Sequence, residues 1–196
     1  NLFNSGSQSY FLYTTLDNLS SPGGFNNSVN FVLDNYVVYN VNQNYIINQS
    51  GIDIDGDSLH FSLTSALSTG IPAPCTYASG YSASSPFGSA GSININPISG
   101  TITFNNTMLA NDVVAVRVDE YRGGQLIASS IRDMQFIFIN GASGNNLPSA
   151  SGVNGSSNYF TSINLCPSST ISFTVSGTDP DLTDSVHVNL KATDIT

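Results

Sequence analysis

Charged side chains are scarce in this sequence of 196 residues. They make up 9% of it, against about 25% in a typical globular protein. Glu120 is the single glutamate and Lys191 the single lysine, whereas exposed helices normally carry ladders of both. With four Lys and Arg side chains and a formal net charge of −9, the chain also lacks the basic surface that binding to nucleic acid requires. A helical fold and binding to nucleic acid are therefore not expected for this chain.

Cysteine is also rare, and long apolar runs are missing. Cys75 and Cys166 are too few for a disulfide framework, and pairing with each other, pairing elsewhere and free thiols all stay open. No run of about 18 apolar residues occurs, so no transmembrane segment is expected. Residues 1–4 lack the basic and apolar regions of a signal peptide. We expect the sequence to be an excerpt from a longer chain.

The apolar residues that are present favour β-strands. Val, Ile, Leu, Phe and Tyr supply most of the 40% hydrophobic fraction and suit a pleated, half-buried surface. Candidate strands recur at short intervals, separated by turn residues, at 10–16, 30–33, 36–40, 45–48, 59–63, 92–96, 101–104, 113–118 and 127–139. This spacing predicts an all-β chain of sandwich type.

The clearest hairpin joins residues 113–121 to residues 126–139. The connection Arg122-Gly123-Gly124-Gln125 has paired glycines, which permit the positive φ angles of a tight reversal. On the first arm Val114, Val116 and Val118 alternate with polar or small residues, so these valines are predicted to face the core and Ala115, Arg117 and Asp119 to face outward.

An acidic turn occurs twice. SGIDIDGDSLHF at residues 50–61 resembles SGTDPDLTDSVHV at residues 176–188, and Gly51 and Gly177 are 126 positions apart. A period of that length indicates tandem domains. We expect Ig/cadherin-like β-sandwiches: the end of a preceding domain plus a linker at 1–26, a complete repeat at 27–140, a linker at 141–146 and the start of the next repeat at 147–196.

The aspartates of these turns are candidate calcium ligands, because closely spaced carboxylates can converge on one hard cation. The EF-hand pattern is excluded, since Ser58 and Thr64 stand where that loop needs glycine and glutamate. An Asx-type turn with solvated aspartates is the alternative. The candidate metal residues, including two acids at the end of the hairpin arm, are Asp53, Asp55, Asp57, Asp119, Glu120, Asp179, Asp181 and Asp184.

Cations other than Lys191 are restricted to Arg117, Arg122 and Arg132. In so acidic a chain each is expected to have a specific carboxylate partner, with Asp119, Glu120 and Asp133 nearby in sequence. For Arg132 and Glu120 we expect a structural ion pair at the hairpin.

The sequence contains no motif that supports an enzyme. His60 and His187 have no second ligand at zinc-binding spacing, and the serine-rich segment at 79–92 has no nearby base. An isopeptide cross-link is excluded for residues 1–190, which contain no lysine. The loop aromatics Tyr77, Tyr81 and Phe87 could contact a sugar, although tryptophan is absent; the alternative is that they anchor the loop to the domain.

Several runs, taken together, resemble the cadherin/Ig-like repeats of giant gliding-motility cell-surface adhesins of the SprB type. The resemblance covers residues 26–140, and residues 147–196 as the opening of a further repeat. The runs are DGDSL at 55–59, FSL at 61–63, YASGYS at 77–82, NPISGTITF at 96–104, VVAVRVDEYR at 113–122, LI at 126–127 and RDMQF at 132–136.

This resemblance implies a non-enzymatic structural and adhesive segment of a very long secreted filament on the outer cell surface, exported by type IX secretion. Its implied partners are neighbouring repeats, the substratum or a surface polysaccharide, and the motility or secretion machinery. Related repeats often carry a cysteine near Asn26 and Asn27, so Cys75 would lack its usual partner here. The alternative function is a carbohydrate-binding module of a secreted polysaccharide-degrading enzyme.

Overall fold

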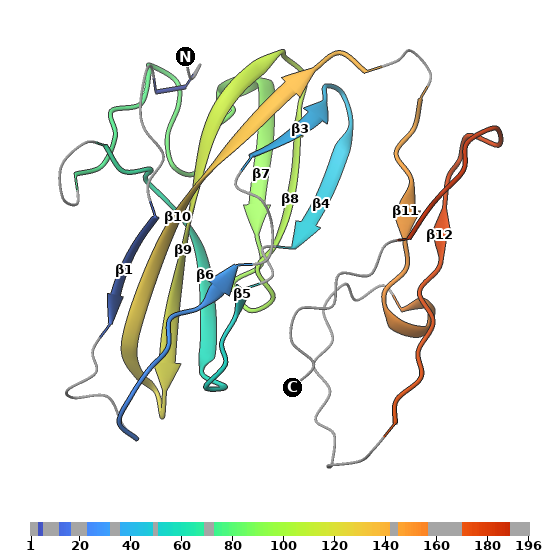
Figure 1. Cartoon of the computed structure of the whole chain (residues 1–196). Coiled ribbons are helices and arrows are strands. Elements are labelled where there is room, and N and C mark those ends of the chain that lie inside the picture. Colours follow the sequence, from blue (N-terminus) through green and yellow to red (C-terminus); the bar gives the residue numbers. More distant parts are fainter. Residues whose placement is uncertain are drawn as a thin grey trace. The chain divides into compact units, whose positions relative to one another are not determined.

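The computed structural model describes residues 4–5, 12–16, 23–31, 36–48, 51–68, 73–141, 145–156 and 170–188. The chain divides into two compact units, Asn1–Gly141 and Ala142–Thr196, which are described separately (Figure 1). Within the described ranges every regular element is a β-strand except two short 3-10 helices, so the all-β prediction is confirmed. No helix in these ranges is long and apolar enough to cross a membrane.

The larger sheet of the first unit is built around one long hairpin. Its strand order is β1-β10-β9-β6, and β3 pairs in parallel with the second half of β10, beyond the stretch that β1 occupies. The other pairs in this sheet are antiparallel. The strands are β1 (Leu12–Leu16), β3 (Tyr36–Asn40), β6 (Ser58–Thr64), β9 (Ala110–Arg122) and β10 (Gln125–Ile139).

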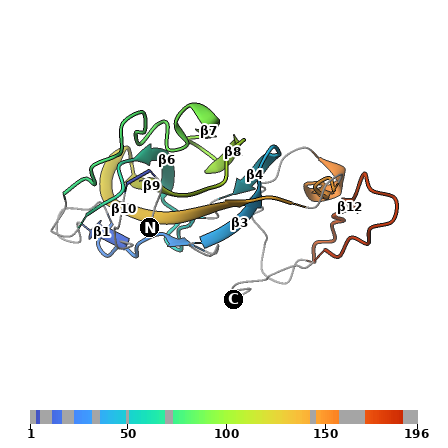
Figure 2. The same cartoon turned by 90° about the horizontal axis from the view of Figure 1, so that it is seen from above.

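A smaller antiparallel sheet has the order β4-β8-β7. Figure 2 shows β10 and β3 in one layer and β7 and β8 in another. A two-residue ladder between β2 and β5 lies outside both sheets. These strands are β2 (Asn30–Phe31), β4 (Asn44–Asn48), β5 (Gly51–Ile52), β7 (Gly91–Ile95, which follows the 3-10 helix η1, Gly88–Ala90) and β8 (Thr101–Asn106).

The main core of the first unit draws side chains from both sheets. Val114, Val116 and Val118 of β9 belong to it, as predicted, and are at most 1% exposed. Aromatic rings fill its centre, with Phe104 of β8 edge-on to Phe136 of β10 at 4.9 Å between ring centroids. Burial of so much aromatic surface is the main stabilising contribution of this unit.

The opposite face of β9 is buried as well. Ala115, predicted to face outward, is 2% exposed and packs with Val113, Ala66 and Cys75 in a second, smaller apolar cluster. The prediction was wrong because a segment distant in sequence covers this face. Cys75 is a free thiol whose pKa is raised by burial, and Cys166 lies outside the described residues.

Residues 1–26 were expected to end a preceding domain, but β1 belongs to the larger sheet of the first unit. β1 pairs with β10 of the same unit, with Thr14 opposite Ser130 and their hydroxyls 3.0 Å apart. Further upstream, the fully buried side chain of Asn4 donates to the carbonyls of Pro86 and Val113, at 3.0 and 2.9 Å, and accepts from the Val113 amide at 3.1 Å. Strand propensity predicted the strand β1 but could not identify the strand with which it pairs.

Two turns are fixed by glycine. Between β9 and β10, Gly123 and Gly124 have φ angles of 59° and 81°, which confirms the predicted tight reversal. Between β7 and β8, the Asn96 side chain accepts from the amides of Ile98 and Ser99, and Gly100 has φ 67°. A Cβ at Gly100 would also lie 2.9 Å from the Phe61 ring, so the turn requires glycine there.

The described part of the second unit has one short ladder. β11 (Ser149–Ala150) pairs with β12 (Gly177–Thr178), and the 3-10 helix η2 (Val153–Gly155) lies between them in sequence. The apolar run at 171–175 precedes the second acidic turn as residues 45–47 precede the first, but it forms no strand, and residues 185–188 after the turn form none either. In the first unit the corresponding strands β4 and β6 are held by β8 and β9.

Asp112 is a buried carboxyl group in the larger sheet. It lies opposite Phe136, is 1% exposed, and neither carboxyl oxygen has a hydrogen-bond partner in the described part of the chain. Burial raises its pKa to about 7, because the charged form loses its hydration. Asp112 therefore holds its proton in the folded chain at pH values where an unfolded aspartate is ionised.

We predict that the protein loses stability as the pH rises from about 4 to about 8, where folding must increasingly bury an ionised Asp112. Asp112→Asn should make this dependence shallower and stabilise the fold at pH 8 by about 2–4 kcal/mol. Urea unfolding at a series of pH values measures both effects. Equal slopes in the variant and the unmodified protein would contradict the assignment.

Candidate functional site

Three carboxylates converge at one end of the larger sheet. Asp53 and Asp57 lie in the turn after β5, and Glu120 lies near the end of β9; each offers an oxygen within 4.8 Å of the others. The sheet register explains the meeting, because Leu59 of β6 pairs with Glu120. The acidic turn, which leads directly into β6, is thereby held beside the end of β9.

The turn is shaped by Asp53. Its Oδ1 accepts from the backbone amides of Asp55, at 2.9 Å, and Asp57, at 3.0 Å, which is the Asx-turn geometry weighed as the alternative. The other oxygen, Oδ2, is buried and has no hydrogen-bond partner within the described ranges. An orphaned buried carboxylate oxygen is costly, and a cation bound there would remove that cost.

Glu120 is fully buried and holds the chain segment that precedes β2. It accepts hydrogen bonds from the Asn26 side chain at 2.8 Å and the Val29 amide at 3.0 Å. Burial raises its pKa; the two hydrogen bonds oppose that rise, and repulsion by Asp53 and Asp57 adds to it. This carboxylate thus joins the N-terminal part of the unit to the acidic turn.

The predicted ion pair between Arg132 and Glu120 is wrong. Arg132 pairs with Val116 across the hairpin, whereas Ala128 pairs with Glu120, so the two side chains are four residues apart along the strands. The guanidinium of Arg132 instead lies over the Phe31 ring, 5.1 Å from its centroid. That arrangement is a cation–π contact.

Arg122 forms the ion pair that the sequence did not reveal. Its guanidinium donates to both oxygens of Asp57, at 2.7 and 2.6 Å, and also to the Asn26 side chain at 2.9 Å. Asp55 lies 3.7 Å away. The Asp57 side chain is 3% exposed, and a bidentate contact of this kind is strong and geometrically specific.

Asp55 and Asp119, the other two acids predicted for this site, have different partners. Asp55 accepts from the backbone and side chain of Asn27. Asp119 pairs with Arg117 at 2.7 Å and accepts from the Ser129 hydroxyl. Adjacent strand residues point to opposite faces, so Asp119 is directed away from the face on which Glu120 lies.

The balance of charge leaves the site acidic. Asp53, Asp55, Asp57 and Glu120 face one guanidinium, that of Arg122. Oxygen ligands and uncompensated negative charge suit a hard divalent cation such as Ca²⁺, and the free Oδ2 of Asp53 fits that role. The other ligands would be Asp57 and Glu120.

The second unit contains the corresponding cluster. Asp179, Asp181 and Asp184 each offer an oxygen within 4.8 Å of the others. Asp179 accepts from the amide of Asp181 at 2.7 Å, as Asp53 does from Asp55. All three acids predicted for this turn are therefore brought together.

A clamp between an asparagine and an aspartate accompanies each turn. Asn27 donates from its backbone amide to one oxygen of Asp55, at 2.6 Å, and from its side chain to the other, at 3.0 Å. Asn146 does the same to Asp181, at 2.6 and 2.9 Å. These hydrogen bonds are the main cause of the lowered pKa of both aspartates. Sequence comparison alone did not pair these asparagines with the turns, although each stands in an Asn-Asn dipeptide.

The loop aromatics do not form an exposed platform for sugars. Phe87 is 1% exposed and belongs to the main core. The Tyr77 ring packs against the second apolar cluster, and its hydroxyl accepts from the Ala66 amide at 3.1 Å, while burial raises its pKa to about 12. Tyr81 is half-buried beside Gly88. The structure agrees with the alternative role of these residues as loop anchors.

Comparison of this chain with protein-family models, with curated proteins and with solved structures finds no match.

We predict that Arg122→Gln lowers the thermal unfolding midpoint by several degrees, because it leaves the buried Asp57 without its charge-assisted hydrogen bonds. Arg117→Gln is the matched control: its side chain is 40% exposed, and such pairs contribute little. Thermal unfolding followed by circular dichroism compares the two. A loss for Arg122→Gln no larger than for Arg117→Gln would show that the Arg122–Asp57 pair is not structural.

Proposed function

We propose that the chain is a tandem-repeat segment of a long extracellular protein that forms a structural and adhesive filament on the cell surface. The observation that carries this proposal is the recurrence of the Asn–Asp clamp. Asn27 with Asp55, and Asn146 with Asp181, make the same pair of hydrogen bonds beside the same kind of acidic turn. Two unrelated domains would have no reason to share this arrangement.

The short ladders beside the clamps support the same proposal. Phe31 pairs with Gly51 in the first unit, and Ala150 pairs with Gly177 in the second. The first members of these pairs are 119 positions apart, as are the two clamp asparagines; the second members are 126 apart, as are the clamp aspartates. The short strand that follows the clamp asparagine and the acidic turn that holds the clamp aspartate thus recur together, and we assign both units to one Ig/cadherin-like repeat.

The clamp suits a mechanical role. In each unit it ties the stretch just before a short strand, β2 or β11, to a turn far along the chain, 28 residues away in one case and 35 in the other. Calcium at Asp53, Asp57 and Glu120, and at Asp179, Asp181 and Asp184, would neutralise the carboxylates beside the clamp and stiffen that stretch. Each unit of such a chain would resist deformation where this stretch meets the acidic turn.

The cellular role rests on the sequence resemblance together with this repeat architecture. We propose type IX secretion, display on the outer surface, and contact with neighbouring repeats, with the motility or secretion machinery, and with the substratum or a surface polysaccharide during gliding. The proposed role is non-enzymatic. The alternative module of a polysaccharide-degrading enzyme relied on Tyr77, Tyr81 and Phe87, and of these Phe87 is buried in the main core, which weakens that alternative.

We expect calcium to stabilise the protein. About 10 mM CaCl₂ exceeds the Kd of extracellular calcium modules at least about tenfold, which corresponds to about 1.4 kcal/mol or more. Asp53→Asn, which keeps the Oδ1 acceptor of the turn but removes the charge, should weaken the response. Asp119→Asn, which alters an acid directed away from the cluster, should preserve it. Thermal unfolding in CaCl₂, in chelator and in NaCl of equal ionic strength measures these effects; no shift with calcium would refute the metal site.

Surface display is tested on intact cells of the source organism. Antibodies raised against the 196-residue chain should label the outside of unpermeabilised cells, and deletion of the gene should impair attachment and gliding on a solid surface, with restoration by the intact gene. Labelling confined to permeabilised cells, or normal attachment and gliding in the deletion strain, would count against the proposed role.

A further inference from the structure

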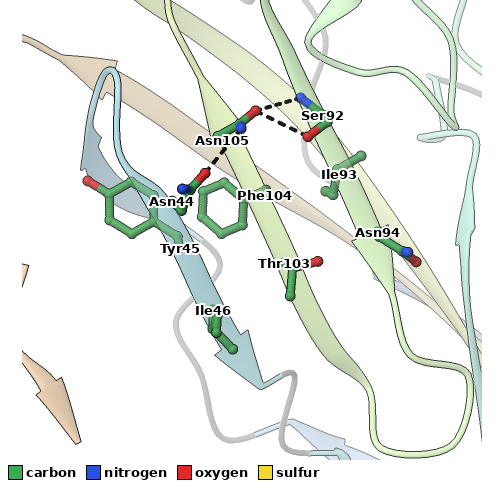
Figure 3. A pocket seen from close by; sticks show the side chains of 9 residues that line it. All are labelled: Asn44, Tyr45, Ile46, Ser92, Ile93, Asn94, Thr103, Phe104 and Asn105. Atoms are coloured by element: carbon green, nitrogen blue, oxygen red, sulfur yellow. Dashed lines mark hydrogen bonds between the residues drawn. The ribbon is translucent and has the colours of Figure 1, made fainter.

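The smaller sheet of the first unit has a shallow hollow on its surface that the acidic site does not use. Its volume is about 550 Å³, and Figure 3 shows the residues that line it. None of them is charged. They come from all three strands: Asn44, Tyr45 and Ile46 of β4, Thr103, Phe104 and Asn105 of β8, and Ser92, Ile93 and Asn94 of β7.

Alternation divides this lining into two sets. Tyr45, Ile93 and Phe104 pack on the main core, so their side chains face the interior of the unit. The side chains between them in sequence face outward, and they fall into two rows that cross the sheet in register. One row is Asn44, Asn105 and Ser92, and the other is Ile46, Thr103 and Asn94.

The first row is held in place by its own hydrogen bonds. Asn105 donates from its side chain to Asn44 Oδ1 at 3.1 Å, and its Oδ1 accepts from the Ser92 amide at 3.0 Å and the Ser92 hydroxyl at 3.1 Å (Figure 3). Among the described residues, the side-chain NH2 group of Asn44 has no acceptor in this arrangement. A ladder fixed in this way presents its remaining polar atoms at defined positions.

The second row leaves its polar groups unused. Asn94 and Thr103 are exposed, and their side chains have no hydrogen-bond partner among the described residues. Ile46, 55% exposed, adds an apolar side chain at the β4 end of the row. The face therefore combines amide and hydroxyl groups, each able to donate and accept, with one apolar side chain.

We propose that this face binds a neutral glycan chain. Sugar hydroxyls both donate and accept hydrogen bonds, as the side chains of Asn94 and Thr103 do, the side-chain NH2 of Asn44 adds a donor, and the C–H face of a sugar ring matches Ile46. The absence of charge from the lining, on a chain with a formal net charge of −9, disfavours anionic glycans.

This inference deepens the proposed adhesive function and rests on it for its strength. The face offers no aromatic ring for stacking, because Tyr45 and Phe104 turn inward, so one unit should bind weakly. Repeated units on one filament would convert weak contacts into firm attachment through a high effective concentration. Weak, repeated contacts also release one at a time, which suits a surface that moves along a substratum.

The test uses NMR titration of the whole 196-residue chain. Cellohexaose, laminarihexaose and mannohexaose serve as neutral probes, and oligogalacturonate as the anionic comparison, each at about 10 mM, which populates even millimolar complexes. At least one neutral probe should shift the side-chain amide signals of Asn44, Asn94 and Asn105, with no comparable shift from oligogalacturonate. No shift at this face with any neutral probe, or an equal shift with the anionic one, would overturn the inference.

The double variant Asn94→Ala with Thr103→Val removes the unused polar groups without breaking the Asn44–Asn105–Ser92 row. It should unfold at the same temperature as the unmodified chain and bind the neutral probe at least about tenfold more weakly. Tyr81→Ala, in the aromatic loop, is the matched control and should bind normally. Weakening by Tyr81→Ala alone would place the glycan on the loop and overturn the assignment.

Failure here is distinguishable from failure of the proposed function. Surface labelling and the deletion phenotype are measured without any sugar, so a filament that is displayed and adhesive but insensitive to these probes would reject the glycan face and leave the repeat proposal standing.

Discussion

Strand β9 is buried on both of its faces, and the first unit is arranged around that constraint. The smaller sheet covers one face, which carries Val114, Val116 and Val118. The loop that carries Cys75 covers the other, which carries Val113 and Ala115. In the sheet this strand lies between β10 and β6. That position brings β6 alongside it and, with β6, the acidic turn to the end where Glu120 and Arg122 lie.

The scarcity of charge gives those two residues their importance. In a chain with many lysines and arginines, the carboxylates of the turn could be neutralised by several alternative partners. Here the single glutamate fixes the segment at Asn26 and Val29, and one arginine fixes Asp57. Because neither has a substitute nearby, the geometry of the turn is specific, and the negative charge that remains in excess is what the proposed calcium ion would neutralise.

Local patterns in the sequence predicted local structure well. The period-two alternation identified the core face of β9, and the paired glycines identified its hairpin turn, since both depend on residues that are close together in the chain. The partner of β1, the burial of Ala115 and the pairing of Arg122 with Asp57 depend on contacts across 65 or more positions or on a covering loop. No periodicity encodes them, and the wrong pairing of Arg132 with Glu120 arose from relying on proximity in sequence.

The candidate metal site likewise combines a local pattern, which the sequence shows, with a contact between residues distant in sequence, which it does not. Spacing showed that aspartates gather at the turn, but strand parity decides which acids of β9 can join them. Glu120 shares the face of Val118, and Asp119 does not.

The clamp between asparagine and aspartate is the same in both units although the number of residues between its two members differs. The interval from clamp asparagine to clamp aspartate is 28 residues in the first unit and 35 in the second, yet the two pairs of hydrogen bonds have nearly the same lengths. The length of the intervening segment therefore does not set the geometry. It is set where the stretch before the short strand meets the acidic turn, and this junction is the part of the unit that a repeated architecture must preserve.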